Sequence, residues 1–195
     1  GLQFLSAPVL GNLSDHFGRR PVLLGSLAAF SADFVVMGLS TTVGWLFLGR
    51  ALSGVFSATY PVVTAYVADL TAPEQRAKSF GLLGAAWGLG FVVGPAIGGL
   101  LGDANPRLPF FVAAGLAAVN VVYGYFVLPE SLAPANRRPF ALKRANPIGA
   151  FIAMRQYPLV VGLLGALLLY HIAHDDNPAT WTYVTIAKFD WTPRD

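Results

Sequence analysis

The feature that most constrains this chain is a series of long apolar segments separated by short polar ones. A helix that crosses a bilayer needs about 20 largely apolar residues. Four segments reach that length, at residues 21–39, 43–67, 80–101 and 109–127. The opening stretch 1–13 is typical of the second half of another span, and residues 159–173 form a shorter apolar segment. We therefore predict an all-α, polytopic membrane protein.

Composition and charge agree with this prediction and exclude other classes. Charged residues make up 12% of the 195 residues, whereas soluble domains carry about 25%. The net charge is +3, but the basic residues lie in short loops and form no stripe, so we predict no nucleic-acid partner. The chain has no cysteine and no recognisable pairing of a nucleophile with a base. We expect neither an enzyme nor a bound cofactor.

One cluster invites a metal-site hypothesis. His171, His174, Asp175 and Asp176 follow the last apolar segment. Their side chains are of types that ligate metals, but no further ligands follow at useful spacing. We therefore predict no metal site there and favour a solvated helix end.

The positions of lysine and arginine predict the orientation in the membrane. Cytoplasmic loops carry an excess of these residues. Strict alternation of the spans places on one side Arg19, Arg20, Arg76, Lys78, Arg137, Arg138, Lys143, Arg144 and Arg155. The other side receives only Arg107, Lys188 and Arg194. We predict that the richer side is cytoplasmic.

The same pattern divides the chain into three parts. Residues 1–131 are predicted to form one half-bundle, and residues 158–195 to begin a second, with an outer tail whose Trp181, Tyr183 and Trp191 suit a membrane interface. Residues 132–157 are predicted to be a mobile, basic, cytoplasmic linker. Both ends look cut, so we expect a fragment whose partners include the remainder of the same chain and the lipid bilayer.

Two charged residues lie inside predicted spans, where charge is costly and usually functional. Asp33 lies six residues before Leu39, and Arg50 seven residues after Val43. At about 1.5 Å per residue both are roughly 10 Å from the same side of the membrane. We hypothesise that Asp33 and Arg50 pair, either as a static buried ion pair or as a titratable site that contacts substrate.

Glycine is concentrated in the span at 80–101. Gly90, Gly94 and Gly98 recur at every fourth position and so share one helical face, with Pro95 beside them. Small residues at this spacing allow helix backbones to approach closely, and an internal proline favours a kink. We predict close helix packing, and a bend or seam that controls a gate.

Several loop and span motifs together resemble the major facilitator superfamily. Residues 11–21 (GNLSDHFGRRP) resemble its cytoplasmic signature between the second and third helices. Residues 48–54 (LGRALSG) are similar to the fourth-helix motif centred on a buried arginine, and residues 90–99 resemble the fifth-helix motif of antiporters. Residues 128–131 (LPES) resemble the close of the sixth helix.

Within the superfamily the chain most resembles the tetracycline-resistance efflux group. The features that carry this resemblance are Gln3 with Ala7-Pro8, Asp33, residues 66–69 (YVAD), residues 177–181 (NPATW) and residues 189–191 (FDW). The resemblance implies a partial bundle that runs from late in the second helix to beyond the seventh. It also implies a bacterial inner-membrane antiporter that exchanges an amphipathic drug for protons.

The resemblance assigns roles to individual residues. Asp15 and Arg19 would latch the inward gate, with Asp69 as their partner and Arg20 beside them, while Gly11 and Gly18 would allow a tight turn. Gln3, Asp33 and Arg50 would line the substrate cavity or couple protons. Gly90, Gly94, Pro95, Gly98 and Gly99 would form the antiporter seam.

Three alternatives remain open from the sequence. The first is a proton-linked uptake carrier of the same fold, against which the antiporter-type glycine motif argues. The second is a transporter-like membrane receptor that binds a ligand without moving it. The third is a decayed gene fragment without function.

Overall fold

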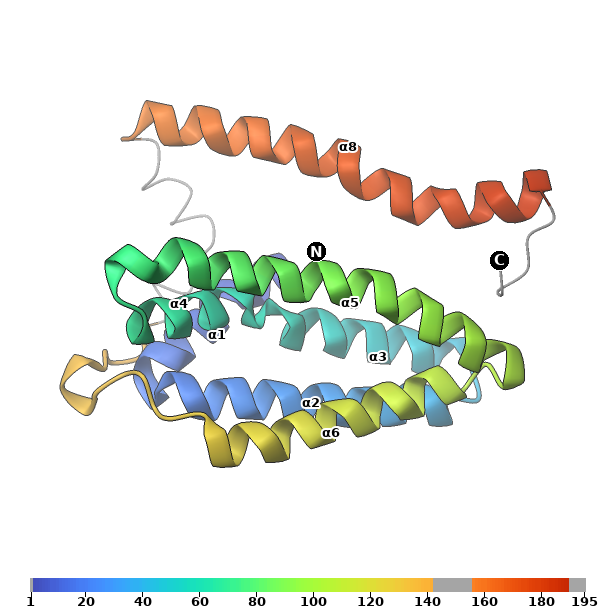
Figure 1. The fold of residues 1–195 in the computed structure, drawn as a ribbon, viewed down its shortest axis with the longest axis horizontal. Helices are drawn as coiled ribbons and strands as arrows, with labels where there is room; N and C mark the ends of the chain where they lie inside the picture. Colours follow the sequence, from blue (N-terminus) through green and yellow to red (C-terminus); the bar gives the residue numbers. More distant parts are fainter. Residues whose placement is uncertain (1, 142–155, 190–195) are drawn as a thin grey trace. The chain divides into compact units, whose positions relative to one another are not determined.

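The computed structural model describes residues 2–141 and 156–189, and all its regular elements are helices. The chain divides into two compact units, residues 1–147 and residues 148–195, which are described separately. The first unit holds the following long helices (Figure 1): α1 (Leu2–Phe17), α2 (Arg19–Leu39), α3 (Val43–Phe56), α4 (Tyr60–Leu70), α5 (Arg76–Ala104) and α6 (Leu108–Val127). The second unit holds α8 (Pro158–Phe189).

The predicted spans are confirmed as helices long and apolar enough to cross a membrane. These stretches run over Arg19–Leu39, Val43–Leu70, Pro73–Ala104 and Leu108–Val127. The last of them contains no Asp, Glu, Lys, Arg or His. A membrane helix satisfies all its backbone hydrogen bonds internally, so the bilayer can act as solvent for its apolar side chains.

The second of these spans is interrupted by a tighter turn. α3 gives way to the 3₁₀ turn η1 (Ser57–Thr59) before α4 begins. Pro61 lies in the first turn of α4 and has no N–H to donate to the preceding turn. The hydroxyl of Thr59 donates to the carbonyl of Phe56 at 2.6 Å, which satisfies one of the acceptors that this interruption leaves free.

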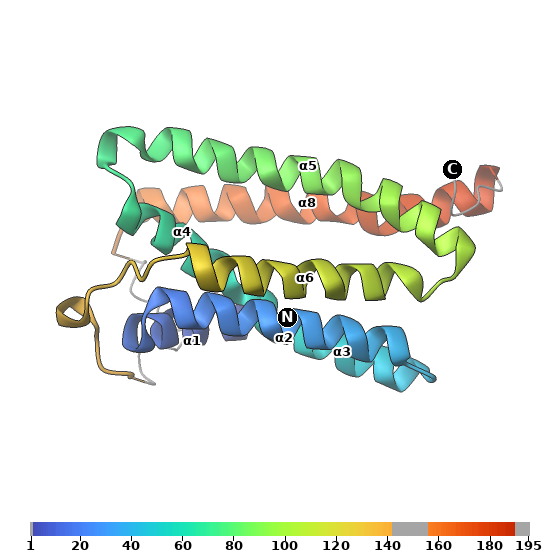
Figure 2. The same cartoon turned by 60° about the horizontal axis from the view of Figure 1, so that its bottom comes forward.

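The first unit is organised around α2, which packs along α6 and also contacts α1 and α3 (Figures 1 and 2). Glycines let α2 and α6 approach closely: Gly38 faces the ring of Phe111, and Gly124 faces Leu24. The hydroxyl of Ser31 also donates to the carbonyl of Ala114 across the same seam at 2.9 Å. The buried core lies at one end and comprises Val22, Leu23, Val62 and Tyr66.

The glycine face of α5 has no packing partner among the described residues. A Cβ added at Gly90, Gly94 or Gly98 would meet nothing within 4 Å. The helix continues through Pro95 from Arg76 to Ala104. Close packing of another helix against this glycine face, which was predicted to include Gly99, therefore stays a prediction.

In the second unit, α8 corrects one prediction. The apolar segment 159–173 is helical as expected, but the helix does not end there and continues to Phe189. The cluster from His171 to Asp176 is therefore inside a helix rather than at its end. The side chains of residues 174–183 are not described, and neither are residues 190–195, which include the predicted interface residue Trp191.

The segment that follows α6 makes contacts that were not predicted from the sequence. Residues 129–141 contain only the short 3₁₀ turn η3 (Pro134–Asn136), but they lie against the ends of α1, α2 and α4 and are hydrogen-bonded to them. We call these residues the strap. The described part of the predicted linker, residues 132–141, is hydrogen-bonded to α1, whereas Lys143, Arg144 and Arg155 lie outside the described residues. Its role as a linker stays a prediction.

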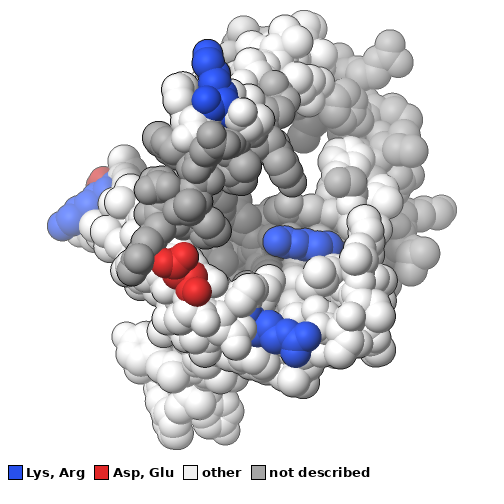
Figure 3. All heavy atoms as spheres, turned by 90° about the vertical axis from the view of Figure 1, so that its right-hand side faces the viewer, with Lys and Arg blue, Asp and Glu red and all other residues white. Residues whose placement is uncertain are grey.

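Charge is distributed unevenly between the two ends of the first unit. The turns at 40–42 and 105–107 include one charged residue, Arg107. Figure 3 views the molecule from this side, where few of the described side chains are charged. At the other end, Asp15, Arg19, Asp69 and Glu130 gather in one polar network, which is the candidate functional site.

Candidate functional site

The network is built around the break between α1 and α2. Gly18 has φ 109° and ψ 159°, a conformation that side-chain-bearing residues rarely adopt. Its N–H donates to the carbonyl of Ser14 at 3.1 Å, so α1 closes and α2 begins one residue later. Gly11, for which a turn was also predicted, lies inside α1 instead, and that expectation is wrong.

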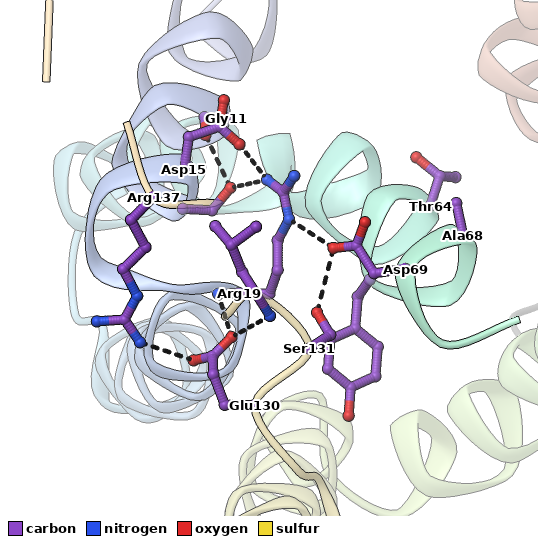
Figure 4. Close-up of polar contacts among 12 residues, drawn as sticks. Gly11, Asp15, Arg19, Thr64, Ala68, Asp69, Glu130, Ser131 and Arg137 are labelled. Atoms are coloured by element: carbon purple, nitrogen blue, oxygen red, sulfur yellow. Dashed lines mark hydrogen bonds and ion pairs between the residues drawn. The ribbon is translucent and has the colours of Figure 1, made fainter. Parts of the chain in front are cut away.

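Arg19 is the centre of the network (Figure 4). Its Nη1 lies 2.5 Å from Oδ1 of Asp15 and donates to the hydroxyl of Ser14 at 2.8 Å. Its Nε lies 3.3 Å from Oδ2 of Asp69 at the end of α4. Only 13% of the Arg19 side chain is exposed. Because Arg19 lies on α2 and contacts Asp15 on α1 and Asp69 on α4, its guanidinium connects the three helices.

Asp69 receives a second donor from the strap. The hydroxyl of Ser131 donates to Oδ2 of Asp69 at 3.3 Å, the same oxygen that faces Arg19. The predicted partnership of Arg19 and Asp69 is therefore present as a contact. Its role as a gate latch stays a prediction.

Glu130 is a member of this network that sequence reasoning missed. Its Oε1 accepts from the backbone N–H of Arg19 at 2.9 Å, where the first N–H groups of a helix lack internal partners and favour negative charge. Its Oε2 lies 4.0 Å from Nη2 of Arg137. The one available signal was its place in the motif at residues 128–131, to which no role was assigned.

The strap contacts α1 and α4 at further points. Tyr66 donates its hydroxyl to the carbonyl of Pro129 at 3.0 Å, and the N–H of Arg138 donates to the carbonyl of Asp15 at 3.0 Å. Asn12, which is buried, donates to the carbonyl of Ala141 at 2.6 Å. The strap is therefore hydrogen-bonded both to α1, which carries Asp15, and to α4, which carries Asp69.

Arg20 is not part of this network. Its Nη2 donates to the carbonyl of Tyr125 in the last turn of α6, and its guanidinium lies 5.2 Å from the centre of the Tyr125 ring. A cation near the C-terminus of a helix is favourable, and stacking on an aromatic face adds to it. Arg20 joins α2 to the end of α6.

A second group of predicted residues lies in the other half of the helices. Asp33 is 3% exposed, and its Oδ2 accepts a hydrogen bond from the hydroxyl of Ser53 on α3. No ion pair joins it to Arg50, which is exposed and has no polar contact among the described residues. The predicted Asp33–Arg50 pair is therefore wrong for this structure. Gln3 donates to the carbonyl of Ser57 at 3.4 Å and connects α1 to η1.

Comparisons with known proteins identify related chains. A sequence profile described as Major Facilitator Superfamily matches residues 1–193. "Tetracycline resistance protein, class C" of Escherichia coli is 40% identical over 191 residues, which cover 98% of this chain and 48% of that protein. "Multidrug resistance protein 2" of Bacillus subtilis is 38% identical over 99% of this chain and 49% of its own length.

A solved structure agrees with these relatives. The crystal structure of the human organic anion transporter MFSD10 (TETRAN) superposes with a TM-score of 0.63 at 32% identity, and covers 71% of this chain and 32% of that one. The chain thus spans about half the length of the curated relatives it matches.

Proposed function

Since this chain belongs to the Major Facilitator Superfamily, we propose that the protein containing it exports tetracycline-like or other amphipathic drugs across the bacterial inner membrane in exchange for protons. Two names among its relatives support this proposal, because they denote resistance to tetracycline and to multiple drugs. The spans support residence in a lipid bilayer.

The observation that carries the proposal is the network around Arg19. A transporter must expose its substrate site to one side of the membrane at a time, which requires contacts that form in one state and break in the other. Asp15, Arg19 and Asp69 are suited to this role because their side chains are partly solvated: Asp15 is 36% exposed and Asp69 31%. Partly exposed ion pairs are individually weak, so a modest free energy separates the closed and open arrangements.

In this proposal the strap makes the network cooperative. Ser131 and Arg19 share one oxygen of Asp69, and Glu130 holds the backbone of Arg19. Breaking the contact between Arg19 and Asp69 therefore exposes several polar groups at once. Networks of this kind contribute more than their separate pairs.

The test is drug accumulation in cells that express the complete reading frame containing this chain. We expect low tetracycline accumulation that rises when the proton gradient is collapsed. Asp15→Asn removes the charge that faces Arg19, and a partly exposed ion pair of this kind contributes up to about 1 kcal/mol. We therefore expect export to fall by up to about fivefold.

Glu74→Gln is the matched control, because Glu74 is an exposed carboxylate at the same end with no contact to the network. It should export like the parent. Tetracycline accumulation equal to that of empty cells, with expression confirmed, would exclude tetracycline as the substrate. The same assay with a fluorescent organic anion would then test the substrate class that the name of the human transporter suggests. Accumulation above that of empty cells would indicate uptake.

A further inference from the structure

The buried carboxyl of Asp33 has a neutral partner rather than a cationic one. Its Oδ2 accepts a hydrogen bond from Ser53, whereas its Oδ1 is buried and has no partner. Oδ1 lies beside Gly49, where an added Cβ would be 3.2 Å away. Gly49 and Ser53 are one helical turn apart on α3, so together they form a seat for the carboxyl.

Among the described residues, no ion pair or hydrogen bond joins a charged side chain to this seat. Arg50 is the one charged residue of α3, and it is exposed and contacts no polar group among the described residues. α6, which also packs against α2, contains no Asp, Glu, Lys, Arg or His. The basic residues of α2 itself, Arg19 and Arg20, lie about 20 Å away along the helix. The hydroxyl of Ser53 is therefore the group that defines how the Asp33 carboxyl is held.

We propose that Ser53 is the positioning residue of the proton-exchange site at Asp33, and that it keeps the carboxyl on the Gly49 side of α3, away from Arg50. This inference rests on the proposed function. A hydroxyl is both a donor and an acceptor. Ser53 can donate to the carboxylate after the proton has left and accept from the carboxylic acid after it returns. The bond to α3 therefore persists in both protonation states.

An arginine partner would act differently. Its guanidinium only donates, so it could not accept a hydrogen bond from the protonated carboxyl. Gly49 leaves the space that this arrangement needs. A Cβ at position 49 would also lie 2.5 Å from Cγ of Met37 on α2. Only glycine therefore lets the Asp33 carboxyl and α2 approach α3 this closely. Loss of the hydroxyl should therefore impair proton exchange and leave the helices packed.

The experiment separates proton exchange from drug binding. The complete protein containing this chain is reconstituted in liposomes, and tetracycline movement is measured in two modes: net transport driven by a proton gradient, and exchange of labelled for unlabelled tetracycline without a gradient. For Ser53→Ala we expect net transport to fall by about tenfold, since the lost bond involves an ionisable group. Exchange should be unchanged, and Ser53→Thr, which retains the hydroxyl, should restore net transport.

The matched control is Ser57→Ala, four residues further along at the start of η1, where the hydroxyl donates to the carbonyl of Gly54 in the last turn of α3. It should behave like the parent in both modes. Net transport by Ser53→Ala equal to that of the parent, or an equal loss in both modes, would overturn the inference about Ser53. Failure of the parent protein to move tetracycline in either mode would instead refute the proposed function for tetracycline, on which this inference rests.

Discussion

Replacing Gly18 by alanine tests how the network is built, and the structure gives its cost in two parts. The first is backbone strain, because φ 109° with ψ 159° belongs to a region essentially restricted to glycine and costs other residues about 1–3 kcal/mol. The second is steric: an added Cβ would lie 2.8 Å from Cδ of Glu130 and 3.1 Å from Nη2 of Arg137. Glu130 must then move and release the N–H of Arg19.

The lost bond involves a charged acceptor, which adds about 1.5–3 kcal/mol. We therefore expect Gly18→Ala to lower the free energy of unfolding by about 2.5–6 kcal/mol. The assay is denaturant unfolding of the complete protein purified in detergent. Gly11→Ala is the control, because Gly11 is in a helix interior with nothing within 4 Å of an added Cβ. It should stabilise the protein by up to about 1 kcal/mol.

A double-mutant cycle separates the two parts. In a Glu130→Ala background the carboxyl that meets the new Cβ is gone, so Gly18→Ala should cost only the backbone part, about 1–3 kcal/mol. Equal costs of Gly18→Ala in both backgrounds would show that Glu130 does not pack against this turn. Unfolding of Gly18→Ala indistinguishable from that of Gly11→Ala would refute the whole argument.

Two further predictions concern α6 and use the same unfolding measurement. Arg20→Lys loses the planar stacking on Tyr125 and should destabilise the protein by about 1–2 kcal/mol, whereas a fully retained stability would show that charge alone suffices. Gly124→Ala places a Cβ 2.9 Å from Cδ2 of Leu24 and should cost about 1–3 kcal/mol through overpacking. Gly115→Ala, with nothing within 4 Å, is its control and should not destabilise; equal losses in both variants would refute the packing argument.

The error over Asp33 and Arg50 shows what periodicity cannot provide. Counting residues from the ends of two neighbouring helices gives depth along the axis, and Asp33 does lie at the level of Gly49. Contact also requires the right direction around the helix, and successive residues differ by about 100°. Arg50 follows Gly49 directly and is turned away from the face that Gly49 and Ser53 share.

The network around Arg19 was only partly predictable for a similar reason. Asp15 and Arg19 are four residues apart, so local geometry already brings them together. Glu130 lies 111 residues from Arg19, beyond the end of α6, and no local pattern relates the two. The helix past Ala173 was missed because hydropathy identifies the segment suited to the bilayer, whereas helix ends depend on capping and packing.

The sequence by itself determined the number and position of the spans in the first unit and the separation of charge between their two ends. Both follow from the cost of polar groups in hydrocarbon, which acts on each segment independently of the others. Only the tertiary structure decided that Glu130 holds the start of α2 and that Ser53 rather than Arg50 holds Asp33. Those contacts depend on how helices distant in the chain are rotated and packed against one another. The close fit of α2 against α6 and α3 determines that rotation and packing.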